Sequence, residues 1–161
     1  MNGRQTAPLQ PAAAVSLPAL RPVIIIDDEP DDLFLLRRLL EKGGVQNPVI
    51  TFLHSEDVRT FFAASAVVQK KVPEYAPCAL FTDLKMPKID GFELLEWLRR
   101  QEAFDDLTII MMSSSDLPAD VERAQKLGAD HYLLKYPSPE RIAEIIAAAG
   151  ESSELNSDSA E

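Results

Sequence analysis

The sequence predicts an α/β domain in which helices cover both faces of one parallel sheet. Two observations support this fold class. Short apolar runs alternate five times with longer amphipathic segments between residues 23 and 149, as repeated strand–helix units with right-handed crossovers do. Hydrophobic residues make up 46% of the 161 residues, which is enough for one buried core with tails.

Each predicted strand is a short apolar run bounded by turn residues or breakers. The first run, VIII, is continuously β-branched, which is typical of a strand that is buried on both faces. Pro77 precedes the third run, and a loop that contains Pro73 separates it from the helix before. The strands are predicted at residues 23–27, 49–53, 78–83, 108–112 and 132–134.

The predicted helices carry recognisable start and stop signals. Leucines at helical spacing mark the apolar stripe of the first helix, which Gly43-Gly44 should end. Ser55 is expected to cap the start of the second helix, and Ser138 that of the fifth. Gly128 should end the fourth. The helices are predicted at residues 30–42, 55–71, 92–101, 118–127 and 139–149.

Charge and cysteine content exclude several classes of function. The formal net charge is −10, with 26 acidic against 16 basic residues, so direct nucleic-acid binding is not expected. The single cysteine, Cys78, lies in an apolar run and cannot form an internal disulfide, which favours a reducing, cytoplasmic location. No apolar stretch is long enough to span a membrane.

Composition also divides the chain. Residues 1–21 are rich in proline and alanine and predict a flexible N-terminal arm. Residues 22–150 form the predicted domain, and residues 151–161 predict an acidic disordered tail. We expect no separate output domain after residue 150.

Charged and hydroxyl side chains stand where four of the predicted strands end. Asp27 ends the first strand and Asp28 follows it, Asp83 ends the third, Ser113 follows the fourth and Lys135 follows the fifth. In an open parallel sheet, ligands bind outside the carboxyl ends of the strands, near the point where strand order reverses. Three carboxylates, one hydroxyl and one ammonium gathered there predict a site for a hard divalent cation and a phosphoryl group.

Four segments, IIIDDEPDD, LFTDLKMPKIDGFELL, IIMMSSS and GADHYLLKYP, resemble in order and spacing the receiver domain of two-component response regulators. The resemblance covers roughly residues 22–150. It implies a flavodoxin-like, doubly wound (βα)5 three-layer sandwich with strand order 2-1-3-4-5. The loop after the second helix is most similar to that of single-domain regulators, including some that are paired with phytochromes.

By position, the resemblance implies that Asp83 is the phosphoacceptor and that Asp27 and Asp28 bind a metal ion. The backbone carbonyl of Lys85 would complete the protein ligands of that ion. A carboxylate can attack a phosphoryl group only when it is ionised, and clustered carboxylates oppose each other's ionisation. The site therefore needs a cation, and Mg²⁺ suits this oxygen donor set.

The resemblance also implies that Ser113 contacts the phosphoryl group and that Lys135 pairs with it. Tyr132 matches the aromatic residue whose rotamer changes on activation, although a half-buried strand aromatic explains it equally well. The family usually has proline directly after the lysine, often with a cis bond. Here Tyr136 intervenes before Pro137, so the loop can differ in shape and a cis bond could precede Pro137.

The implied partners are proteins. A sensor histidine kinase, for which a phytochrome is one candidate, would supply the phosphoryl group. Phosphorylation would change the surface of the fourth helix, fifth strand and fifth helix, which would bind a downstream protein, a phosphotransfer protein or a second copy of the chain. We expect no true enzyme activity beyond phosphotransfer to Asp83 and slow self-dephosphorylation.

Other readings of the same residues stay open. A Mg²⁺-dependent phosphohydrolase could use Asp83 as its nucleophile, but it would favour an acid two residues later, where Lys85 stands. A flavin-binding module would need a phosphate-binding loop after the first strand, where the acidic residues would repel phosphate. A receiver-like adaptor that is never phosphorylated is the remaining alternative. Asp31 and Asp32 are most simply helix-start charges.

Overall fold

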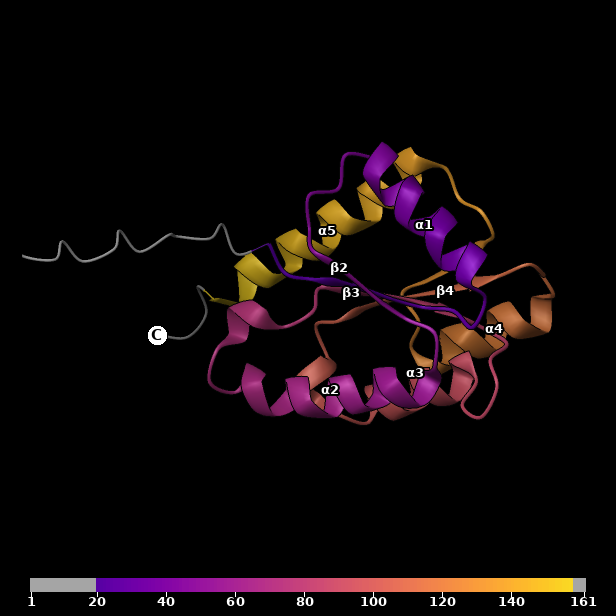
Figure 1. Cartoon of the computed structure of the whole chain (residues 1–161). Helices are drawn as coiled ribbons and strands as arrows, with labels where there is room; N and C mark the ends of the chain where they lie inside the picture. The colour runs from indigo at the N-terminus through magenta and orange to yellow at the C-terminus, as the bar shows by residue number, and fades with distance from the viewer. Residues whose placement is uncertain (1–19, 158–161) are drawn as a thin grey trace, which may run out of the picture.

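The five predicted strands form one parallel sheet in the order β2-β1-β3-β4-β5, so the predicted fold class is confirmed. The computed structural model describes residues 20–157, without the side chains of residues 74 and 152–157 (Figure 1). Strand order reverses at β1, which pairs with β2 on one side and β3 on the other. The strands are β1 (Val23–Ile26), β2 (Val49–Phe52), β3 (Ala79–Asp83), β4 (Thr108–Ser113) and β5 (His131–Leu134).

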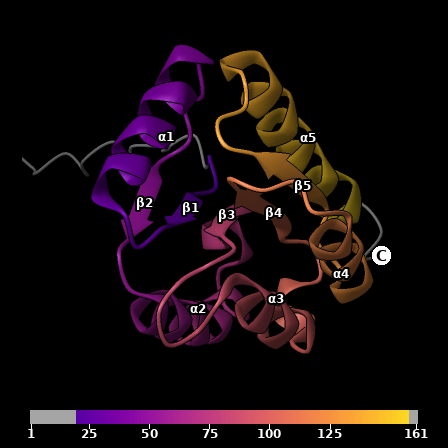
Figure 2. The same cartoon turned by 90° about the vertical axis from the view of Figure 1, so that its right-hand side faces the viewer.

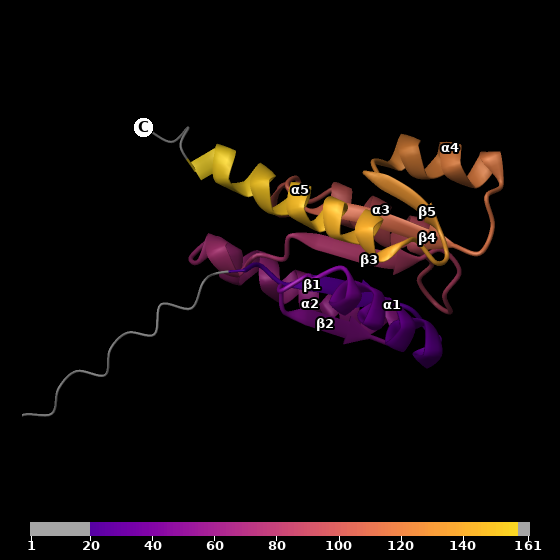
Figure 3. The ribbon, with the colours of Figure 1, turned by 90° about the horizontal axis from the view of Figure 1, so that it is seen from above.

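Helices cover both faces of the sheet. Helices α1 and α5 lie together on one face, and α2, α3 and α4 lie on the other (Figure 2). Figure 3 looks onto the layer formed by α1 and α5. Two short 3-10 helices, Pro73–Tyr75 and Glu102–Phe104, lie in the loops before β3 and β4. The helices are α1 (Pro30–Lys42), α2 (Ser55–Gln69), α3 (Gly91–Arg99), α4 (Pro118–Leu127) and α5 (Pro139–Ser157).

The core has two parts because successive side chains of a strand point to opposite faces of the sheet. Ile24 and Ile26 of β1 pack with the buried side chains of α2, α3 and α4. Val23 and Ile25 pack with the leucines of α1 and the isoleucines of α5. All four residues are buried, as the continuous β-branched run predicts. Cys78 is also buried, and its burial raises the pKa of the thiol.

Ser55 does not cap α2, contrary to the prediction. His54 occupies the N-cap position, and Ser55 is the buried first residue of the helix. The Ser55 hydroxyl donates to the carbonyl of Pro87 (3.1 Å) and accepts from the backbone N–H of Ile89 (3.3 Å). These contacts tie α2 to the loop that follows β3. The prediction is wrong because a tertiary contact takes the hydroxyl that a local cap would have used.

The two ends of the domain also differ from the predictions. Arg21, the last residue of the expected flexible arm, is anchored because its guanidinium donates to the carbonyls of Ala76 (2.7 Å) and Pro77 (2.9 Å). Helix α5 continues to Ser157, well past residue 149 and into the expected disordered tail. After Gly150 the sequence holds no proline or glycine that would end the helix. Residues 1–19 and 158–161 of the predicted arm and tail lie outside the described residues. Within the described part, no helix has the length and apolar character needed to cross a membrane.

Candidate functional site

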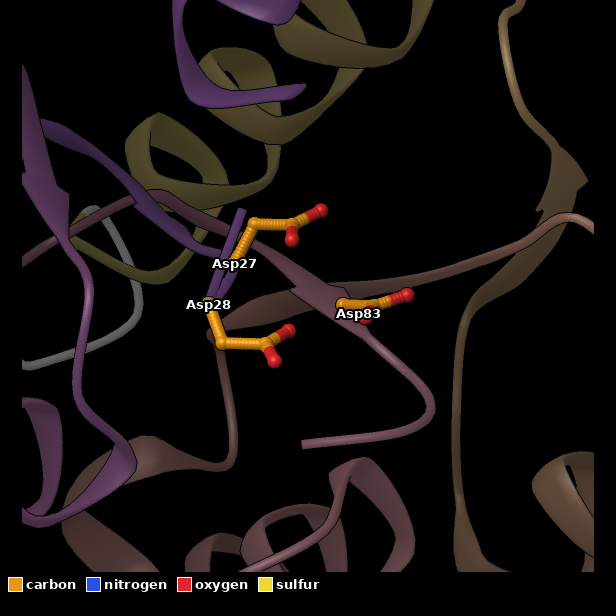
Figure 4. Close-up of side chains that lie close together, drawn as sticks. All are labelled: Asp27, Asp28 and Asp83. Carbon is orange, nitrogen blue, oxygen red and sulfur yellow. The ribbon is translucent and has the colours of Figure 1, made fainter. Parts of the chain in front are cut away.

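The ends of β1 and β3 place three carboxylates side by side. Ile26 pairs with Thr82 in the parallel register, so the next residues, Asp27 and Asp83, are neighbours at the carboxyl edge of the sheet. Asp28 follows directly, and Figure 4 shows the three aspartates gathered at these strand ends. Each offers an oxygen that lies within 4.8 Å of the others. The predicted clustering of the three residues is therefore present.

Lys135 reaches this cluster from the far side of β4. It follows β5, and its backbone N–H donates to the carbonyl of Ser113 (2.9 Å). Its ammonium contacts the carboxylates of Asp27 (2.8 Å), Asp32 (2.8 Å) and Asp83 (3.2 Å). Only 7% of the Lys135 side chain is exposed. Because β4 lies between β3 and β5, a long side chain is needed to bring a charge from β5 to the point where strand order reverses.

Ser113 and Tyr132 lie along the next two strands. Ser113 is the buried last residue of β4, and its hydroxyl oxygen accepts from the backbone N–H of Ser115 (3.1 Å). The hydroxyl of Tyr132 donates to the carbonyl of Ser115 (2.9 Å). The half-buried tyrosine is thus bound to the loop that follows β4. The proposed roles of Ser113 and Tyr132 in phosphoryl binding and switching stay predictions.

Asp32 is a site residue that sequence reasoning missed. Its position in the sequence predicts a helix-start charge, but one carboxylate oxygen accepts from Lys135 and the other from the hydroxyl of Tyr136. Helical spacing was the signal in the sequence that could have identified Asp32 as an inward-facing residue. Asp32 lies four residues before Leu36 and therefore on the same face of α1, and Leu36 is buried in the core. Asp31 is exposed, as a helix-start charge should be.

The loop after Lys135 differs from the shape we considered. A cis peptide bond joins Lys135 to Tyr136, one bond earlier than the Tyr136-Pro137 bond suggested by the sequence. The loop brings the Tyr136 hydroxyl to α1, where it donates to Asp32. Lys135 and Tyr136, which are consecutive, therefore both bind the carboxylate of Asp32.

Burial dominates the electrostatics of the site. It raises the pKa of Asp83, and the charge of Asp27 raises that pKa further, while Lys135 opposes the shift. Burial also raises the pKa of Asp27, against the hydrogen bonds from Lys135 and the Glu29 N–H. For Lys135, burial lowers the pKa, but hydrogen bonds to Asp27 and Asp32 outweigh it and the net pKa is raised. Lys135 is therefore a stable cation among carboxylates that outnumber it.

These shifts predict how Asp83 affects stability in the absence of metal. Because the folded pKa of Asp83 lies above its ordinary value of 3.8, this carboxyl stabilises the fold below that value and loses the contribution as pH rises through the folded pKa. The Asp83→Asn variant has no carboxyl group at this position, so its stability does not fall in this way as pH rises. In urea unfolding with a chelator, the unfolding free energy of Asp83→Asn relative to the parent should increase from about pH 4 to about pH 7. A difference that stays constant over this range would contradict the prediction.

Comparison with known proteins identifies the family. The model of the response regulator receiver domain matches residues 23–147. The chain belongs to this family. Receiver domains are signalling modules of two-component systems and not typical enzymes, and they interact with histidine kinases.

Individual relatives agree with this assignment. This receiver is 31% identical to the two-component response regulator ARR9 of Arabidopsis thaliana over 136 residues, which are 76% of this chain and 55% of ARR9. It is 29% identical to the protein PilG of Pseudomonas aeruginosa, over 78% of this chain and 84% of PilG. The chain spans about half the length of ARR9 and of the Bacillus subtilis regulator PhoP.

Solved structures show the same fold. The bacteriophytochrome response regulator AtBRR superimposes with a TM-score of 0.67 and 26% identity, covering 81% of this chain and 93% of AtBRR. The bacteriophytochrome response regulator RtBRR gives a TM-score of 0.64 at 26% identity, over 81% of this chain and 78% of RtBRR. Both are similar in fold to this receiver over most of its length.

Proposed function

We propose that this receiver accepts a phosphoryl group on Asp83 from a sensor histidine kinase and acts as a single-domain response regulator. One observation carries the proposal: the carboxylate of Asp83 lies at the edge where strand order reverses, beside Asp27 and Asp28 and 3.2 Å from the ammonium of Lys135. A nucleophile, a set of hard oxygen donors and a fixed cation thus share one place. This is the combination that phosphoryl transfer to a carboxylate requires.

In the proposed transfer, a carboxylate oxygen of Asp83 forms a bond to phosphorus. The bond from phosphorus to the histidine nitrogen of the kinase breaks, and that nitrogen keeps the electron pair. The product is an acyl phosphate. Lys135 would stabilise the charge on the phosphoryl oxygens, because its buried ammonium already faces Asp83. Ser113, at the end of β4, would supply a hydroxyl donor to the same group.

The residues present fit a magnesium ion. Asp27, Asp28 and Asp83 offer hard carboxylate oxygens from one small region, which suits Mg²⁺ better than a softer metal. The backbone carbonyl of Lys85 is proposed as a further ligand. When bound, the ion would offset the carboxylate charge that Lys135 alone leaves uncompensated and would help to neutralise the phosphoryl oxygens.

Intact-mass measurement tests the proposed function. The protein is incubated with acetyl phosphate and Mg²⁺, and the mass should increase by one phosphoryl group. The same incubation with excess chelator should give no increase. Release of many equivalents of phosphate per chain from small phosphate esters would instead support the phosphohydrolase. A chain that stays unlabelled with both acetyl phosphate and an active donor kinase in Mg²⁺ would support the adaptor.

The output surface is proposed to be that of α4, β5 and α5. The Tyr132 hydroxyl, bound to the loop between β4 and α4, would report the state of Ser113 to this surface. Leu117 and Leu134 are 56% and 48% exposed at its edge, where a partner or a second copy of the chain would contact them. The similarity to bacteriophytochrome response regulators supports a phytochrome-type kinase in the cytoplasm as the donor. Phosphotransfer profiling against candidate kinases would identify it.

A further inference from the structure

Asp32 stands in the site without a role in phosphoryl transfer. It belongs to the first turn of α1, and it is not one of the three carboxylates that the described residues offer to a shared metal ion. Nevertheless, its contact with the Lys135 ammonium, at 2.8 Å, is as short as that of Asp27. A carboxylate that contacts Lys135 but is not among the proposed metal ligands can act on the site through that lysine.

We propose that Asp32 is a competing counter-ion for Lys135, and that Lys135 exchanges Asp32 for the phosphoryl oxygens when Asp83 is phosphorylated. This inference rests on the proposed function of Asp83. Asp32 is then a positioning residue that opposes phosphorylation by holding the ammonium on the α1 side of the site.

Hydrogen bonds hold the ammonium of Lys135 beside Asp27 and Asp32. It donates to both carboxylates at 2.8 Å, whereas its contact with Asp83 is a longer ion pair at 3.2 Å. Two of its three N–H donors are therefore directed away from the acceptor residue. A phosphoryl group on Asp83 would add charged oxygens on the Asp83 side of the ammonium, and close contact with them would draw Lys135 away from one of its two nearer partners.

Burial decides which partner Lys135 gives up. The side chain of Asp27 is 6% exposed, whereas that of Asp32 is 20% exposed. Water can therefore replace the lysine at Asp32 more readily than at Asp27, where the loss would leave a buried charge without its partner. Asp27 is also a proposed metal ligand, so the site retains Lys135 beside it. Asp32 is the contact whose loss costs least.

Tyr136 fixes the position of the Asp32 carboxylate. Its hydroxyl donates to the oxygen of Asp32 that Lys135 does not contact. The carboxylate is thus held against the loop after β5 by two consecutive residues. Tyr136 is itself 45% exposed, so release of Lys135 from Asp32 removes a bond between this exposed loop and α1.

The experiment compares Asp32→Asn with Asp31→Asn. Both changes remove one negative charge from the same helix turn, but Asp31 is exposed. With saturating Mg²⁺ and acetyl phosphate, we expect Asp32→Asn to take up label about three- to tenfold faster than the parent, the size of a partly buried ion pair. Asp31→Asn should stay within about twofold. Asp32→Glu, which keeps the carboxylate, should label more slowly than Asp32→Asn.

A double-mutant cycle separates positioning from a structural role. Tyr136→Phe should give a smaller increase than Asp32→Asn, and it should add nothing in the Asp32→Asn background because the hydroxyl acts through Asp32. Affinity for beryllofluoride, a phosphoryl mimic, should tighten in Asp32→Asn by a similar factor in calorimetry. A purely structural role would lower stability and give no such gain.

The outcomes distinguish this inference from the function on which it rests. A parent that labels normally, with Asp32→Asn no faster than Asp31→Asn, would overturn the exchange alone. Additive effects of Tyr136→Phe and Asp32→Asn would overturn the role of the tyrosine. A parent that takes no label from any donor would overturn the proposed function, and the exchange with it.

Discussion

Asp83→Asn is expected to abolish phosphoryl labelling of this receiver. The amide has nearly the shape of the carboxylate, so the surrounding side chains can stay in place, but its neutral oxygen is a poor nucleophile and cannot form a stable acyl phosphate. Intact-mass analysis with acetyl phosphate and Mg²⁺ should show a labelling rate lowered by at least about a hundredfold. The effect is large because a single atom of Asp83 takes the new bond.

Asp105→Asn is the matched control for this experiment. It makes the same chemical change at an exposed residue before β4, at the opposite end of the sheet from the acidic cluster. Its labelling should equal that of the parent. Retention of the label by Asp83→Asn, or its appearance on a peptide that contains Asp27 and Asp28, would contradict the assignment of Asp83 as the acceptor.

Gly91→Ala is expected to destabilise the domain and to disturb the site together. Gly91 begins α3, and its backbone N–H donates to the carbonyl of Leu84 (2.9 Å). A Cβ at this position would lie 2.3 Å from the carbonyl oxygen of Asp83 and 3.0 Å from the Cα of Leu84. Both are backbone atoms, so the strand end must shift to accommodate the methyl group. Overpacking of this kind costs about 1–3 kcal/mol.

Urea unfolding of Gly91→Ala and Gly150→Ala measures this cost. Nothing lies within 4 Å of a Cβ built at Gly150, which is within α5, so alanine there should stabilise the helix by about 0.5–1 kcal/mol. Under conditions in which Gly91→Ala is folded, its labelling should still be slower than that of the parent, because the clash is with the acceptor residue itself. Equal stability and equal labelling of Gly91→Ala and the parent would refute the proposed close approach.

The sequence alone placed the main charges correctly. The alternation of apolar runs with amphipathic segments predicts parallel strands, and parallel strands bring their carboxyl ends to one edge of the sheet. Asp27, Asp28 and Asp83 therefore had to lie near one another once β1 and β3 were neighbours, which the resemblance to receiver domains implied. The resemblance also implied the order of the strands and the three-layer architecture, and both are confirmed.

Predictions made from neighbouring residues were wrong where a distant segment of the chain binds the side chain instead. Ser55 has the sequence context of a helix cap, yet its hydroxyl is bound to a loop 32 and 34 residues away. Asp32 has the context of a helix-start charge, but its partners Lys135 and Tyr136 are 103 and 104 residues away. The contacts of Ser55 depend on how α2 packs against the loop after β3, and those of Asp32 depend on how α1 packs against the loop after β5.

The difference between what the sequence predicted correctly and what it missed has one physical cause. Hydrophobic periodicity and strand-end chemistry are properties of short segments, so the sequence by itself determined the elements and the edge at which the acidic residues gather. The choice of partner for each polar side chain is made when packed elements force donors and acceptors together and exclude water. Only the tertiary structure therefore decided that Lys135 is shared between the acceptor site and Asp32.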